Sequence, residues 1–151
     1  MNKKRVIFFI MMIGMMMLIF FFSSQNGEES SAMSSGIFLR LKENFNVNID
    51  IGVIRKLAHL TEYLFLGVSA ILYVGTFKNS DEKSMAIATA ICVLYAVSDE
   101  FHQYFIANRD GRFGDVLIDS TGAMLGITIT MLILLIMRRK NDKKITIWHL
   151  N

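Results

Sequence analysis

Ionisable side chains recur at helical spacing inside apolar stretches of this sequence. In "RKLAHLTEYL", His59 and Glu62 lie three residues apart and therefore share one face of a helix. An imidazole beside a carboxylate can accept and release a proton, which is the chemistry of a general acid or base. Because ionisable groups inside an apolar helix usually face a bundle interior or a water-filled cavity, we expect both side chains to point away from lipid.

A second group follows in "YAVSDEFHQ". Asp99, His102 and Gln103 share one face of a helix, and Asp99 with His102 makes a second candidate acid–base pair. Glu100 points in another direction if the helix continues, so we expect it to pair with a basic residue of a neighbouring helix.

A third group opens the next apolar run, "DVLIDSTGAMLG". Asp115 lies in the first turn, where a carboxylate can simply cap the helix, but Asp119 is one turn too deep for that role. Gly122 and Gly126 continue the line with G-x-x-x-G spacing, which lets another helix approach closely. The pattern predicts a tightly packed helix whose polar line faces inward.

Basic side chains accompany these acids. Arg109 and Arg112 flank the Asp-Gly turn of "RDGR", and arginine is the side chain best suited to bidentate binding of phosphate or carboxylate. The alternative is that both arginines neutralise the nearby acids in structural ion pairs. Arg55 and Lys56 have an alternative of their own, since either could be an interfacial anchor whose charged head reaches water.

The elements that must position these groups are apolar runs near residues 6–22, 57–77, 84–105 and 116–137. A membrane-spanning helix needs about 17–25 predominantly apolar residues, and the third run is long enough only if its acidic end stays helical. Hydrophobic residues make up 53% of the chain and charged residues only 19%. We predict an all-α, four-transmembrane helix bundle that forms a single domain over residues 1–151, with an uncleaved signal anchor as its first helix.

Lysine and arginine set the expected orientation, because cytoplasmic loops of membrane proteins are enriched in both. Ten of the 16 basic residues fall on the side of the N-terminus, and six fall in the longer loops on the opposite side. Both termini are therefore predicted to be cytoplasmic, and the acids and histidines described above to lie toward the outer surface. His59, Asp99 and Asp119 each lie about one turn from the outer boundary of their runs, so we expect them to share a depth and to converge.

The first outer loop is predicted to hold one further element. It begins with "SSQNGEESSAMSSG", a polar stretch rich in glycine and serine that is typical of a flexible segment. Apolar residues then recur at helical spacing and predict a short amphipathic helix, which would lie on the membrane surface, cover the polar site or simply pack on the protein surface. These residues are Ile37, Phe38, Leu41 and Phe45.

Taken in order, the polar segments resemble the VanZ-like family of bacterial membrane proteins over roughly residues 20–130. The shared pattern is Lys-x-x-His with a following Tyr, an Asp-Glu-x-x-Gln block, an Arg in the loop, and an Asp leading into a Gly-x-x-x-Gly helix. In this sequence the pattern corresponds to Lys56, His59, Tyr63, Asp99, Glu100, Gln103, Arg109, Asp115, Gly122 and Gly126.

That family takes its name from resistance to teicoplanin, a lipoglycopeptide that acts on cell-wall precursors at the outer membrane face. The resemblance implies a multi-pass protein of the bacterial cytoplasmic membrane with a role in the cell envelope, but it supplies no particular reaction. The sequence departs from the pattern in two ways. Ala107 and Asn108 stand where family members often carry a proline, and Asp119 stands where asparagine is common.

Three functions fit these residues. The first is an outward-facing site for an anionic amphiphile, such as a lipid phosphate or a lipid-linked envelope precursor, with or without chemistry on it. Its candidate acid–base residues are His59, Glu62, Asp99 and Glu100, and its candidate ligand contacts are Lys56, Tyr63, His102, Gln103, Arg109, Arg112, Asp115 and Asp119.

The second function is a non-catalytic membrane module, whose polar groups form a structural network and whose outer loops bind a partner or the drug. The third is a metal site with His59, His102 and carboxylates as ligands, but the spacings lack an H-E-x-x-H or cysteine pattern, so we expect no metal or other cofactor. Scattered basic residues also predict no nucleic-acid partner. Cys92, the only cysteine, is expected to be a small buried hydrophobe.

Overall fold

The computed structural model describes residues 3–45, 50–109 and 111–148, without the side chains of residues 37, 41, 42, 45 and 141–148. These residues form helices α1 (Lys3–Ser23), α2 (Gly27–Phe45), α3 (Ile51–Val74), α4 (Asp81–Gln103) and α5 (Phe113–Trp148), and no strand occurs among them. Four helices are long and apolar enough to cross a membrane: α1, α3, α4 and the Phe113–Lys140 part of α5. The predicted all-α architecture with four membrane-spanning helices is confirmed.

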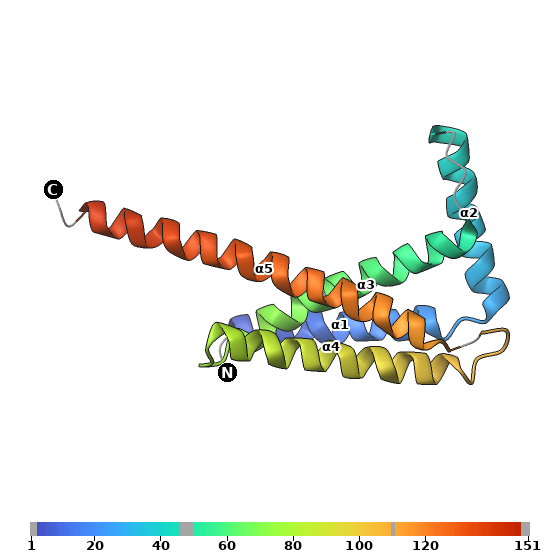
Figure 1. The fold of residues 1–151 in the computed structure, drawn as a ribbon, viewed down its shortest axis with the longest axis horizontal. Helices are drawn as coiled ribbons and strands as arrows, with labels where there is room; N and C mark the ends of the chain where they lie inside the picture. The colour runs from blue at the N-terminus through green and yellow to red at the C-terminus, as the bar shows by residue number, and fades with distance from the viewer. Residues whose placement is uncertain (1–2, 46–49, 110, 149–151) are drawn as a thin grey trace.

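The four long helices pack into one bundle; α2 leaves it at one end, and the C-terminal part of α5 extends past it at the other (Figure 1). The most extensive packing joins α3 to α5, and α5 also packs on α4 while α1 packs on α3. The start of α1 and the turn between α3 and α4 lie at one end of the bundle. The turn between α1 and α2 and the loop between α4 and α5 lie at the other end, which we call the loop end (Figure 1).

Two helices extend beyond the predicted apolar runs. Charged residues mark the end of an apolar run in the sequence, but they can still be helical. α3 begins at Ile51, six residues before the predicted start, because Asp50 caps it by accepting a hydrogen bond from the Gly52 amide at 2.7 Å. α5 continues to Trp148, well past the predicted end near residue 137. Its extension is rich in lysine and arginine, which are good helix formers.

The segment predicted to be flexible after α1 is also helical. Asn26 and Glu29 form a reciprocal capping box: the Asn26 side chain accepts from the Glu29 amide at 2.8 Å, and the Glu29 carboxylate accepts from the Asn26 amide at 3.3 Å. The serine hydroxyls that follow donate to carbonyls one turn back, which compensates part of their low helix propensity. The predicted amphipathic helix therefore belongs to a longer α2, although the side chains of Ile37, Leu41 and Phe45 lie outside the described residues.

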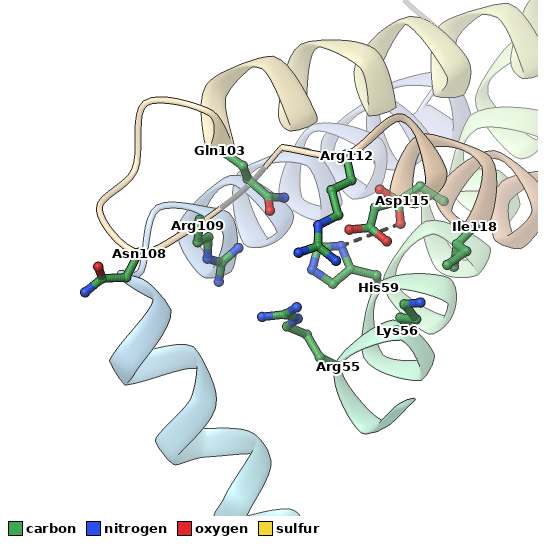
Figure 2. A pocket seen from close by; sticks show the side chains of 10 residues that line it. Arg55, Lys56, His59, Gln103, Asn108, Arg109, Arg112, Asp115 and Ile118 are labelled. Atoms are coloured by element: carbon green, nitrogen blue, oxygen red, sulfur yellow. Dashed lines mark ion pairs between the residues drawn. The ribbon is translucent and has the colours of Figure 1, made fainter. Parts of the chain in front are cut away.

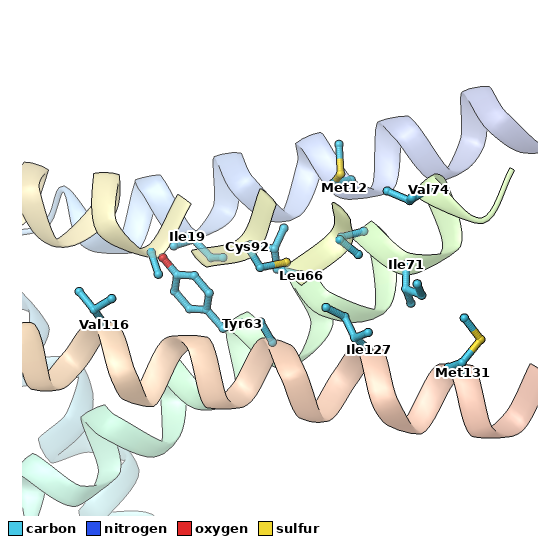
Figure 3. Close-up of a cluster of buried hydrophobic side chains, with 14 residues drawn as sticks. Met12, Ile19, Tyr63, Leu66, Ile71, Val74, Cys92, Val116, Ile127 and Met131 are labelled. Carbon is cyan, nitrogen blue, oxygen red and sulfur yellow. The ribbon is translucent and has the colours of Figure 1, made fainter. Parts of the chain in front are cut away.

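A single apolar core runs along the contact of α1, α3, α4 and α5 (Figure 3). Cys92 is fully buried in it, as predicted. The opposite faces of the helices keep large apolar side chains exposed, such as Leu94 at 70% and Met17 at 68%. Apolar residues on both the inner and outer faces are what a helix needs when its surroundings are lipid.

Small residues bring α3 and α5 into backbone contact. A methyl group added at Gly122 would meet the backbone carbonyl of Leu60, and one added at Gly126 would meet that of Leu64. Gly67 of α3 makes the reciprocal contact with the backbone of Ala123. The close helix approach predicted from the G-x-x-x-G spacing is confirmed.

We predict that Gly122→Leu destabilises the protein by about 3 kcal/mol or more, because ordinary overpacking costs about 1–3 kcal/mol and here a rigid backbone blocks the new side chain. The measurement is thermal unfolding of the purified protein in detergent. Gly14→Leu is the matched control, since a methyl group added at that position of α1 would meet no atom of a packed neighbour among the described residues within 4 Å. Equal melting of the two variants would contradict the close α3–α5 contact.

We predict that the loop end faces the cell exterior, because the basic residues favour the other end. In a Cys92→Ala background, a membrane-impermeant thiol reagent added to intact cells should label Glu28→Cys, which lies at the loop end. The same reagent should leave Lys78→Cys unlabelled, because residue 78 lies in the turn between α3 and α4 at the opposite end. The reverse labelling pattern would overturn this orientation.

Candidate functional site

Four ionisable side chains from three helices converge near the loop end. His59 of α3, Asp99 and Glu100 of α4, and Asp119 of α5 each place one potential ligand atom within 4.8 Å of the others. The predicted convergence of His59, Asp99 and Asp119 is confirmed. We call these four residues the acidic cluster, and its shortest ion-pair contact is 3.5 Å between His59 Nδ1 and Asp119 Oδ1.

The α3–α5 contact explains how part of the acidic cluster forms. Leu60, whose carbonyl lies against Gly122, directly follows His59, and Gly122 lies three residues after Asp119. The backbone approach at this level therefore places the imidazole beside the carboxylate. Asp119 is fully buried, whereas 16% of the His59 side chain is exposed.

Hydrogen bonds from α1 and α4 hold Asp99 in place. The Ser23 hydroxyl donates to Asp99 Oδ2 at 2.9 Å, and the Gln103 amide Nε2 donates to the same oxygen at 3.0 Å. Both donors are buried with the carboxylate. Ser23 was not among the predicted site residues, because it opens the polar stretch after the first apolar run and local sequence does not indicate which helix it meets.

The loop between α4 and α5 holds Glu100. The backbone amide of Arg112 donates to Glu100 Oε2 at 2.9 Å, and the ion pairs among the described residues do not include the predicted one between Glu100 and a basic residue of a neighbouring helix. The loop can fold back this closely because position 111 is glycine: an added methyl group would meet the Glu100 carbonyl. As a result Glu100 is 5% exposed and turns into the bundle.

A cavity of about 220 Å³ opens beside the acidic cluster (Figure 2). Six of the predicted ligand contacts line it, and so do His59 and Arg55. The complete lining is Arg55, Lys56, His59, Gln103, Asn108, Arg109, Arg112, Asp115, Ile118 and Asp119. Two members of the acidic cluster thus contribute to the cavity wall, while Asp99 and Glu100 do not.

Four cationic side chains and two carboxylates line this cavity. Arg55 from α3 and Arg109 and Arg112 from the α4–α5 loop direct their guanidinium groups toward the same space (Figure 2). Burial, followed by the charge of Arg55, lowers the pKa of Arg109, but an arginine remains protonated at physiological pH. Converging guanidinium groups in a half-enclosed cavity form a site suited to an anion.

The backbone of the loop fixes Arg109. The Gly27 amide donates to the Ala107 carbonyl at 3.1 Å, and Asn108 adopts a left-handed conformation with φ of 58°, which asparagine tolerates better than most residues. The Arg109 guanidinium donates through Nη2 to the Phe22 carbonyl at 3.0 Å. Contacts to the end of α1 and the start of α2 therefore hold the arginine although the loop carries no proline.

Five of the predicted site residues lie outside the cavity lining: Asp99, Glu100, His102, Tyr63 and Glu62. His102 stacks on Phe20 with ring centroids 4.9 Å apart, and its Nε2 lies 3.2 Å from the Ser24 hydroxyl. Tyr63 is fully buried in the apolar core, and Glu62 is half-buried on α3. Conversely, Arg55 lines the cavity, although it was not among the predicted contacts. Helical spacing alone does not distinguish a ligand contact from an interfacial anchor at this position.

Of three comparisons with known proteins, one found a match. No curated protein and no solved structure matches the chain. A family model described as VanZ/LLP1 matches residues 8–135, a range that includes the acidic cluster and every residue of the cavity lining. The protein is a membrane protein by its four apolar helices, and the chain belongs to the VanZ/LLP1 family.

Proposed function

We propose that this protein binds the anionic head group of a cell-envelope amphiphile, such as a lipid phosphate or a lipid-linked precursor, in an outward-facing cavity of the bacterial cytoplasmic membrane. One observation carries the proposal: Arg55, Arg109 and Arg112 point into one cavity at the loop end of a membrane-spanning bundle. Arginine binds phosphate oxygens in bidentate geometry, and each charged hydrogen bond contributes about 1.5–3 kcal/mol.

The size and surroundings of the cavity suit an amphiphile. A volume of about 220 Å³ accommodates a head group rather than a drug-sized molecule, for which pockets of about 300–1,000 Å³ are usual. Phe113 and Leu117 neighbour the lining residues on α5 and are exposed by 77% and 55%. In lipid, such side chains offer an apolar surface along which acyl chains would lie.

The proposal concerns binding and assigns no reaction. His59 lines the cavity, so it is the predicted acid–base residue that would face a bound head group. Asp99 and Glu100 do not line it, and Glu62 also lies outside the lining. A role for His59 in proton transfer would need a substrate whose reacting atom reaches the imidazole.

The alternative function is a membrane module whose polar network is structural. The Ser23–Asp99 hydrogen bond and the Arg109–Phe22 hydrogen bond favour it, because both tie α1 or its C-terminal turn to the rest of the bundle. The role of Arg55 distinguishes the binding function from the structural one. Among the described residues it has no hydrogen-bond or ion-pair partner, so a purely structural network does not need its charge.

We predict that Arg55→Ala weakens binding of phosphatidic acid about tenfold or more, because one charge-assisted contact is lost. The measurement is native mass spectrometry of the purified protein with added phosphatidic acid, together with its melting temperature. Arg40→Ala is the matched control, since Arg40 is exposed on α2 and lies outside the cavity lining. Unchanged lipid binding in both Arg55→Ala and Arg109→Ala would contradict the proposal and favour the structural alternative.

We further propose a role in the cell envelope that includes lowered sensitivity to teicoplanin. Wild-type protein should protect a susceptible bacterial host, and Arg109→Ala, His59→Ala and Asp115→Ala should each abolish that protection at normal membrane levels. Cys92→Ala should retain it, because the thiol is buried in the apolar core away from the cavity. Protection by all four variants would show that the cavity residues are not required.

A further inference from the structure

The acidic cluster contains more buried carboxylate than its protein neighbours can neutralise. Asp99, Glu100 and Asp119 are exposed by 3%, 5% and 0%. His59 is the only basic side chain within ion-pair distance of any of the three, counting the residues that the structure describes. A buried carboxylate is strongly disfavoured unless it is paired, protonated or bound to a metal ion.

Several polar atoms of the acidic cluster have no hydrogen-bond partner among the described residues. In the described part of the chain, neither carboxylate oxygen of Asp119 has a hydrogen-bond partner, and Asp99 Oδ1, Glu100 Oε1 and His59 Nδ1 also lack one. All four residues can place a ligand atom within 4.8 Å of the others. Since metal–ligand bonds are about 2.0–2.6 Å long, ligands on opposite sides of one ion lie about 4–5 Å apart.

The hydrogen bonds around the acidic cluster orient its carboxylates for such a role. Ser23 and Gln103 both donate to Oδ2 of Asp99, which leaves Oδ1 without a partner. The Arg112 amide donates to Oε2 of Glu100 and leaves Oε1 without a partner. Outer hydrogen bonds that fix one oxygen and leave the other available are typical of metal-binding carboxylates.

We propose that His59, Asp99, Glu100 and Asp119 bind one divalent metal ion, with Mn²⁺ and Zn²⁺ as the ions best suited to this ligand set. Imidazole favours transition metals over Mg²⁺ and Ca²⁺, while three carboxylates suit a hard divalent ion. The ion would neutralise most of the buried charge. Because His59 and Asp119 also line the cavity, it would lie next to the space where an anion binds.

The sequence does not favour this site, because its ligands come from three helices and form no local motif. Residues 59, 99–100 and 119 meet only after α3, α4 and α5 have packed. The metal site also does not depend on the proposed amphiphile, since its four ligands and their orienting hydrogen bonds are complete without one.

The test is metal binding by the full-length protein purified in detergent. After removal of bound metal with a chelator, the protein is titrated with Mn²⁺, followed by electron paramagnetic resonance, and with Zn²⁺, followed by calorimetry. The wild type should bind about one ion per chain. Asp119→Asn, which keeps the side-chain volume, should bind at least about 100-fold more weakly, and Gln103→Leu about 10–100-fold more weakly.

Glu82→Gln is the matched control, because Glu82 is an exposed carboxylate of α4 outside the acidic cluster and its substitution should leave affinity unchanged. Melting curves verify that each variant is folded. Failure of the folded wild type to bind either ion, or equal affinity in Asp119→Asn, would overturn the proposal and indicate a cluster neutralised by shared protons. Arg55→Ala should bind the ion normally, so a failure of the amphiphile proposal is distinguishable from a failure of this one.

Discussion

The backbone contact between α3 and α5 determines the geometry of the loop end. Gly122 and Gly126 let α5 lie directly against carbonyl groups of α3, and Gly67 makes the same approach from the other side. Any larger residue at these positions would separate the two helices and, with them, His59 and Asp119. In a membrane, where burial of apolar surface does not drive helices together, such close packing is a main source of helix association.

This packing produces two layers of opposite charge. The acidic cluster is buried between α3, α4 and α5, and the arginines of α3 and the α4–α5 loop line the cavity beside it. Each layer is energetically unfavourable without a counter-ion. Buried acids need a cation to offset their charge, and grouped arginines need an anion. A metal ion in the cluster and an anionic head group in the cavity would satisfy both requirements, and the two proposals are chemically compatible for that reason.

The sequence predicts the four spans and the shared depth of His59, Asp99 and Asp119, because hydropathy and helical spacing reflect local physics. It does not predict the partners of Glu100 or Ser23, since these depend on how the α4–α5 loop folds and on which helices become neighbours. Arg55 remained ambiguous because an anchor and a ligand contact share the same helical position. The capping box of Asn26 and Glu29 is visible in the sequence, but the serine-rich composition around it favoured a flexible segment.

An experimental structure of the protein in a lipid environment with added short-chain phosphatidic acid would test the central claim most directly. The claim is that the converging polar residues at the loop end form a binding site. We expect density for a phosphate group within hydrogen-bonding distance of Arg55 and Arg109 inside the cavity. A cavity that holds only water, with Arg55 turned toward bulk solvent and the polar network otherwise unchanged, would contradict the claim and leave those residues a purely structural role.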